Sequence, residues 1–100
     1  MLTPLPAAVT CMQDPETRGN PREVYVWLHQ RLDVQHFRAV KVDEVSFSMR
    51  LSRSAAGEAL LTLVRLGYLD RAPLDRRAYT YRLFHSNPAR EMAALAAIVR

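Results

Sequence analysis

Two groups of side chains in this sequence have the chemistry of a phosphate-binding surface. Ser52, Arg53 and Ser54 stand at the predicted start of a helix, where the partial positive charge of the N-terminus favours an anion. Three further cations flank a predicted turn: Arg71, Arg76 and Arg77. Arginine binds phosphate through paired N–H donors, so both groups predict contacts to a nucleic-acid backbone. The alternative for the second group is a solvated surface turn.

The helix that follows Ser52 is predicted to have an outward ridge opposite its buried stripe. Its outward positions are Ser54, Gly57, Glu58, Leu61 and Arg65. Glu58 can accept a hydrogen bond from a cytosine amino group, and Leu61 can contact a thymine methyl group. Neither is a strong base reader, so we expect specificity to depend also on DNA shape. Gly57 fits either a close approach by another backbone or simple tolerance of a mediocre helix residue.

Arg50 is predicted to lie in the turn before that helix, within reach of a phosphate.

The histidines and the cysteine do not form a catalytic or metal-binding pattern. His29, His36 and His85 lack the spacing of zinc ligands, and Cys11 is distant from them in sequence. The phosphate-binding loop, the G-x-S-x-G elbow and the H-E-x-x-H motif are missing. We therefore expect no enzyme activity, no metal and no cofactor. A ligand or redox sensor built around Cys11 remains an alternative.

Composition is that of one small globular domain. The chain has 100 residues, 49% of them apolar and 24% charged, with a net charge of +4. This basicity permits a nucleic-acid partner without requiring one. A single cysteine fits a reducing compartment, and no apolar run is long enough to span a membrane. We expect a cytoplasmic protein that has no membrane partner.

Hydrophobic spacing predicts the elements that position the cations. Asn20 is predicted to cap a helix whose first residue is Pro21. That helix has an apolar face formed by Val24, Trp27, Leu28 and Leu32. Residues 37–42 are predicted to form a link with a short strand, and residues 43–51 a short helix. Ser52 caps the next helix, Arg53–Leu66, which Gly67 ends in a left-handed conformation. Its buried stripe is predicted to be Ala56, Ala59, Leu60 and Leu63.

The segment after Gly67 predicts a β-hairpin. It begins at Tyr68 and returns over residues 78–84, where apolar and polar side chains alternate. Tyr79 and Tyr81 of the returning strand are expected to pack on the helices rather than to stack on bases.

The last segment predicts a helix that Pro88 opens and that runs to Arg100. That helix has an apolar face formed by Met92, Leu95, Ile98 and Val99. We expect this face to form a homodimer, since two-fold dimers match palindromic operators. Packing within one chain is the alternative.

The segment VDEVSFSMRLSRSAAGEALLTLVRLGYLDR, followed by YTYRL, resembles the winged helix-turn-helix domains of bacterial and phage regulators and plasmid replication initiators. The resemblance covers roughly residues 20–84. It implies a mainly α fold with a small β-hairpin (α+β), a three-helix core plus wing, and an extra C-terminal helix. It divides the chain into an N-terminal arm (1–19), the winged domain (20–85) and the last helix (86–100).

The resemblance also implies a function. Arg53–Leu66 corresponds to the recognition helix and Asp70–Arg77 to the wing. The expected activity is sequence-specific or shape-reading binding of double-stranded DNA by a small dimeric transcriptional regulator, which acts by site occupancy. The alternative is a protein-interaction module in a larger assembly, without direct base reading, because winged helices also serve as docking domains.

Overall fold

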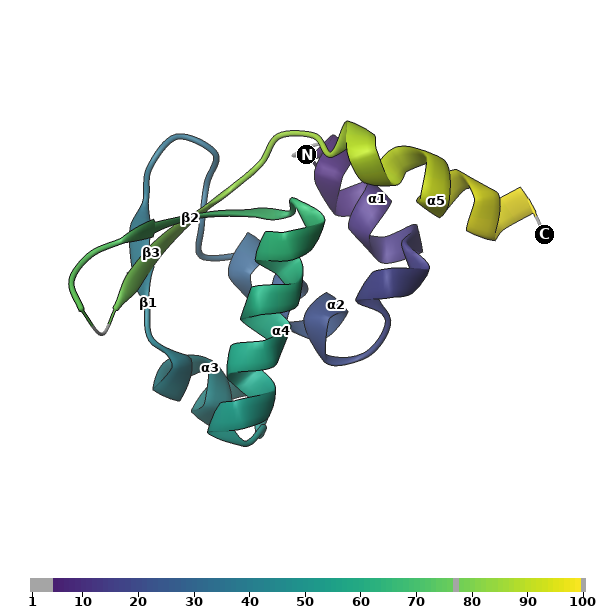
Figure 1. The fold of residues 1–100 in the computed structure, drawn as a ribbon. Coiled ribbons are helices and arrows are strands. Elements are labelled where there is room, and N and C mark those ends of the chain that lie inside the picture. The colour runs from purple at the N-terminus through teal and green to yellow at the C-terminus, as the bar shows by residue number, and fades with distance from the viewer. Residues whose placement is uncertain (1–4, 77, 100) are drawn as a thin grey trace.

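The structure is a computed structural model that describes residues 5–76 and 78–99. Within these residues the chain forms five α-helices, one 3-10 helix and three strands (Figure 1). In chain order they are α1 (Pro6–Gln13), η1 (Pro15–Thr17), α2 (Asn20–His29), β1 (Arg38–Val40), α3 (Val42–Met49), α4 (Arg53–Leu66), β2 (Leu69–Pro73), β3 (Tyr79–Leu83) and α5 (Pro88–Val99). The fold is α+β, as the sequence predicts at this level.

The strands form one antiparallel sheet in the order β1-β3-β2. Tyr81 of the central strand lies opposite Arg71 of β2 on one side and Arg38 of β1 on the other. The hairpin and the short strand within residues 37–42 are confirmed. The sequence did not show that β1 would extend the hairpin into a three-stranded sheet. Tyr81 and Leu83 alternate toward the core, where each is 3% exposed.

The helix α4 matches its prediction closely. The Ser52 hydroxyl accepts a hydrogen bond from the Ala55 N–H at 3.0 Å, which caps the N-terminus. Gly67 ends the helix at φ 87°, a left-handed conformation that favours glycine. The buried stripe is the predicted one: Ala56, Ala59, Leu60 and Leu63. This stripe packs α4 against α2 and α3, and it leaves the opposite face of the helix outward.

The turn from α3 to α4 has an unusual backbone. Arg50 has φ 55° and ψ 43°, the left-handed region that a side chain disfavours by roughly 1–2 kcal/mol. Local hydrogen bonds hold it there, because the Ser46 hydroxyl donates to the Leu51 carbonyl at 2.6 Å and the Leu51 N–H donates to the Ser46 carbonyl at 3.0 Å. This turn fixes how α4 follows α3.

The segment predicted as an N-terminal arm is packed against the domain wherever the structure describes it. Residues 5–19 form α1 and η1, and Ala7 and Cys11 of α1 are fully buried. The apolar side chains at helical spacing enter the core, and α1 packs between α2 and α5. Residues 1–4 lie outside the described residues. Pro6 begins α1 at a position where a helix tolerates proline.

A buried carboxylate joins this N-terminal layer to the rest of the fold. Asp14 is 0% exposed, and both of its oxygens accept hydrogen bonds from Arg90 of α5 at 2.8 Å. The Tyr68 hydroxyl donates to it at 2.7 Å and the Glu16 N–H at 2.9 Å. Burial raises the pKa of this carboxyl, but the hydrogen bonds from Arg90, Glu16 and Tyr68 outweigh burial and lower it to about 2.

The helix α5 packs against α1, and the residue before it is bonded to the end of α4. Ala94 is the α5 residue that is buried, and Asn87, just before the helix, donates from its side chain to the Leu66 carbonyl at 2.8 Å. The predicted apolar face points elsewhere. Its four members are exposed: Met92, Leu95, Ile98 and Val99. Packing of this face within the chain is therefore not observed, whereas dimerisation through it stays a prediction.

Candidate nucleic-acid interface

The outward face of α4 is the base of a shallow hollow. It is lined by Val42, Arg53, Ser54, Gly57, Glu58 and Leu61. Four of the predicted ridge residues therefore lie together: Ser54, Gly57, Glu58 and Leu61. Arg65 follows one turn later on the same helix and is exposed. The ridge has helical spacing because its residues lie on the side of α4 opposite the buried stripe.

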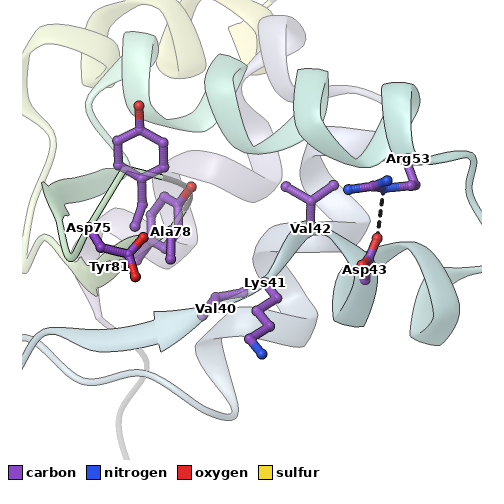
Figure 2. Close-up of a pocket in the computed structure, with 9 residues that line it drawn as sticks. Val40, Lys41, Val42, Asp43, Arg53, Asp75, Ala78 and Tyr81 are labelled. Atoms are coloured by element: carbon purple, nitrogen blue, oxygen red, sulfur yellow. Dashed lines mark ion pairs between the residues drawn. The ribbon is translucent and has the colours of Figure 1, made fainter.

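A second hollow lies between the start of α4, the junction of β1 with α3, and the hairpin (Figure 2). Its lining comprises Val40, Lys41, Val42, Asp43, Arg53, Asp75, Ala78, Tyr79 and Tyr81. Val42 and Arg53 line both hollows. The face of α4 and the turn end of the hairpin therefore line adjoining hollows, which together form one concave surface.

Arg53 is held at the point where the two hollows meet. Its Nε lies 2.7 Å from Asp43 Oδ1, and both side chains are mostly exposed. Figure 2 shows the guanidinium of Arg53 reaching toward the carboxylate of Asp43 from the facing helix. An aspartate near a helix start can cap it, but α3 has no side-chain cap and this carboxylate binds Arg53 instead. An exposed pair of this kind contributes less than about 1 kcal/mol, so an anion can replace Asp43 as the partner.

On the hairpin, Arg71 is positioned by an aromatic ring. Its guanidinium carbon lies 4.2 Å from the centre of the Tyr79 ring, a cation–π contact that keeps the cation exposed and oriented. Burial raises the pKa of Tyr81, and the nearby Arg71 opposes this rise. Both tyrosines were expected to pack on the helices. Tyr81 is buried, as expected. Tyr79 is 42% exposed, and its ring contacts Arg71 instead.

The other predicted cations are placed around the hollows. Arg76 is exposed in the turn of the hairpin, and Arg50 is exposed in the turn between α3 and α4. Arg77 lies outside the described residues. Neither Arg50 nor Arg76 lines either of these two hollows, so both would contact a partner that extends beyond the concave surface.

Lys41 was not among the predicted site residues. It is the residue directly before α3, it is exposed, and it lines the hollow beside the hairpin. The signal available in the sequence was its position between a predicted strand and a predicted helix, next to the helix-turn-helix segment. Its neighbour across the hollow, β3, is more than 35 residues away in sequence, so local pattern could not reveal the neighbourhood.

The charged side chains that line the two hollows carry a small net negative charge. Lys41 and Arg53 are the cations, and the anions are Asp43, Asp75 and Glu58. The excess positive charge comes from arginines at the margins. A polyanion would therefore bind mainly through the rim, with the centre of the surface contributing fit rather than charge.

The described residues give little support for a metal site, a reactive cysteine or a membrane-spanning helix. No group of three or more His, Cys, Asp or Glu side chains there has the geometry of a metal site. Burial raises the pKa of the Cys11 thiol to about 12, so this thiol is a poor nucleophile at neutral pH and a weak basis for a redox sensor. Among the helices described, none has the length and apolar character needed to cross a bilayer.

Comparisons with known proteins do not assign the chain to a family. Searches of protein-family models, of curated proteins and of solved structures each returned no match. A function is therefore inferred from the geometry and charge of the surface that α4 and the hairpin share.

Proposed function

We propose that this protein is a winged helix-turn-helix DNA-binding protein of the cytoplasm that regulates transcription by occupying its site. The observation that carries the proposal is the continuous concave surface that joins α4 to the hairpin through Val42 and Arg53. The succession of α2, β1, α3, α4, β2 and β3, with β1 and β2 on either side of β3, supports it. This is the order of elements that a winged helix requires.

In the proposed complex α4 enters the major groove and the hairpin lies along the flanking backbone. Arg53 exchanges Asp43 for a phosphate at the N-terminus of α4, where the helix dipole adds attraction. Arg71 and Arg76 bind phosphates on the wing side. Glu58 and Leu61 touch base edges but supply little discrimination, so DNA shape supplies the rest. The protein carries out no chemistry on the DNA.

The test is binding to duplex DNA by fluorescence anisotropy at a series of salt concentrations. We expect micromolar or tighter binding at low salt and a linear fall of log K with log salt, as counterion release requires. A single-stranded oligonucleotide of equal charge is the control for a general attraction to polyanions. If duplex binding is missing at low salt, or equals single-strand binding throughout, the proposal is wrong.

A second function is favoured by the same surface. The hollow on α4 combines apolar Val42 and Leu61 with a balanced pair of charges, Arg53 and Glu58. Such a centre suits a protein partner, because interface cores are depleted of net charge. In that case the face of α4 docks a partner protein. The variant Leu61→Arg separates the two functions, since it abolishes an apolar protein contact but strengthens attraction to DNA.

A further inference from the structure

The helices α3 and α4 end in the same backbone arrangement but with different residues. At the end of α4, Gly67 has φ 87°, and the N–H of Tyr68 donates at 2.9 Å to the carbonyl of the fifth residue before it. At the end of α3, Arg50 has φ 55°, and the N–H of Leu51 donates at 3.0 Å to the carbonyl of the fifth residue before it. Both ends are Schellman motifs, in which the left-handed position is most commonly glycine.

Arg50 departs from the preference that the other left-handed positions follow. Three described residues have a positive φ, and two of them are the glycines Gly19 and Gly67. The third is Arg50. A side chain makes the left-handed conformation unfavourable because its Cβ lies too close to the following carbonyl oxygen. At this turn, therefore, the chain keeps a side chain in spite of backbone strain.

Contacts within the fold do not explain the arginine. The Arg50 side chain is exposed, and it forms no hydrogen bond or ion pair with the residues that the structure describes. The bonds that hold the turn come from the Ser46 hydroxyl and from backbone groups. A glycine at position 50 would keep all of these bonds and would adopt the same φ without strain.

The two helix ends also differ in their surroundings. The end of α4 is covered by the fold, because a Cβ at Gly67 would contact the side chain of Asn87 at 3.4 Å. Arg50 is exposed, in the turn that Figure 1 shows at the end of α4 that points away from α1 and α5. Strained residues of this kind cluster at binding surfaces, where a ligand contact is the reason for keeping them.

The position of Arg50 indicates which ligand its side chain suits. Arg50 precedes Arg53 by three residues, and Arg53 lines both hollows of the concave surface. Arg53 is paired with Asp43, whereas Arg50 has no carboxylate partner among the described residues. Arg50 is therefore an uncompensated cation beside the N-terminus of α4. The planar guanidinium of arginine offers paired N–H donors that match a phosphate group.

We propose that Arg50 binds a phosphate of duplex DNA, and that arginine at this position lowers the stability of the chain while it raises the affinity for DNA. The inference rests on the proposed function and adds a contact to it, next to the phosphate assigned to Arg53. Phosphate contacts fix the orientation of a protein on the duplex without reading its sequence. The contact of Arg50 would therefore orient the N-terminus of α4 in the same way on every site.

The experiment measures stability and DNA affinity on the same variants of the full chain. Thermal unfolding is followed by circular dichroism, and binding to a random-sequence duplex is followed by fluorescence anisotropy at a series of salt concentrations. Arg50→Gly should raise the melting temperature by about 4 °C, because glycine relieves the strain. The same variant should bind the duplex about tenfold more weakly at low salt, and its salt slope should fall by about one, because one phosphate contact is lost.

Three further substitutions separate the charge from the backbone. Arg50→Asn removes the charge but keeps a side chain that tolerates the left-handed conformation, so the affinity and the salt slope should fall as they do in Arg50→Gly. Arg50→Lys keeps the charge and the strain, so the melting temperature and the salt slope should match those of the unmodified protein. Arg18→Ala removes an exposed cation from the segment before α2 and should leave DNA binding unchanged.

Four results would overturn the inference. If Arg50→Gly binds the duplex with unchanged affinity and slope, the arginine is merely tolerated, and the proposed function still stands. If Arg50→Gly weakens binding but Arg50→Asn does not, a loosened turn is responsible and no phosphate contact has been lost. If Arg50→Gly is no more stable than the unmodified protein, arginine does not lower stability at this turn. Absence of duplex binding by the unmodified protein at low salt would overturn the proposed function together with this inference.

Discussion

Asp43 of α3 holds Arg53, the first residue of α4, by an ion pair of 2.7 Å at the centre of the concave surface. The cation best placed to bind a phosphate at the helix N-terminus is thus occupied by a carboxylate in the free protein. In the proposed DNA complex a phosphate would have to replace this carboxylate, so Asp43 is expected to compete with the phosphate. The strength of the exposed pair sets the size of the competition.

Replacing Asp43 by Asn should therefore strengthen DNA binding. The variant loses a pair worth about 0.2–1 kcal/mol, and this corresponds to a gain of up to about fivefold in affinity. Anisotropy titrations at constant salt measure it, with Asp33→Asn as a control that removes the same charge on the segment before β1. Equal affinities of Asp43→Asn and the unmodified protein would show that Arg53 is not released on binding.

Removal of the hairpin cations should weaken DNA binding uniformly across sequences. Arg71→Ala combined with Arg76→Ala deletes two of the side chains proposed to bind phosphates, and the salt slope should fall by about one for each arginine removed. Affinities are compared for several unrelated duplexes over a series of salt concentrations. Arg31→Ala, which removes a cation stacked on Trp27 of α2, is the matched control and should leave the slope unchanged. A hairpin variant with an unaltered slope would exclude this wing.

The variant Gly57→Ala tests whether α4 has glycine at this position for a structural or for a functional reason. A Cβ at this position would meet no atom within 4 Å, so nothing inside the fold requires glycine. Gly57→Ala should raise the free energy of unfolding by about 0.5–1 kcal/mol, because alanine is the better helix former. Urea denaturation measures this. If the stabilised variant also binds DNA less tightly, a DNA backbone approaches α4 closely at Gly57; unchanged affinity would favour simple tolerance.

The Asp14 network should dominate the stability of the chain. Asp14→Asn leaves Arg90 beside a neutral group and should lower the free energy of unfolding by roughly 3–5 kcal/mol, as for other broken buried pairs. The control is Asp70→Asn, which breaks the more exposed pair of Asp70 with Arg82 and should change stability by less than about 1 kcal/mol. Similar losses in both variants would contradict the assignment of Asp14 as the main anchor.

The lowered pKa of Asp14 predicts that the free energy of unfolding decreases at acid pH. The pKa of Asp14 is about 2 in the folded chain, below the value of about 3.9 expected in the unfolded chain. A lowered pKa stabilises the fold above the unfolded value, and this contribution is lost as pH falls from about 4 to 2. The pKa of Asp33 is also lowered to about 2, first by the backbone N–H of His36, so this residue titrates in the same window. Unfolding measured against pH should show a shallower limb in Asp14→Asn, and an identical limb would assign it to Asp33.

The sequence predicted elements whose signals are local. Ser52 and Gly67 mark the ends of α4 through rules that involve a few neighbouring residues, and the helical period of Ala56, Ala59, Leu60 and Leu63 identifies the buried face. The placement of α1 could not be predicted in this way. Its burial depends on contacts with α2 and α5, which follow later in the chain.

The candidate site could be predicted only where a single helix or turn carries its residues. The α4 ridge was found because one helix carries it, and the hairpin cations were found because one turn carries them. Lys41 and the contact of Arg53 with Asp43 were missed, since they depend on the angle between α3 and α4. That angle depends on the left-handed backbone at Arg50, and an arginine gives no sequence signal for that conformation.

The bond between Asp14 and Arg90 spans 76 positions of the chain. During synthesis the N-terminal half, including α1, emerges well before the arginine that neutralises its carboxylate. Tyr68, whose hydroxyl donates to Asp14, is also synthesised only after α4. Contacts this distant in sequence form late because closing a long loop is entropically unfavourable. The docking of α1 is therefore expected to be the last event of folding, and a ribosome-bound chain that ends before α5 should leave α1 undocked.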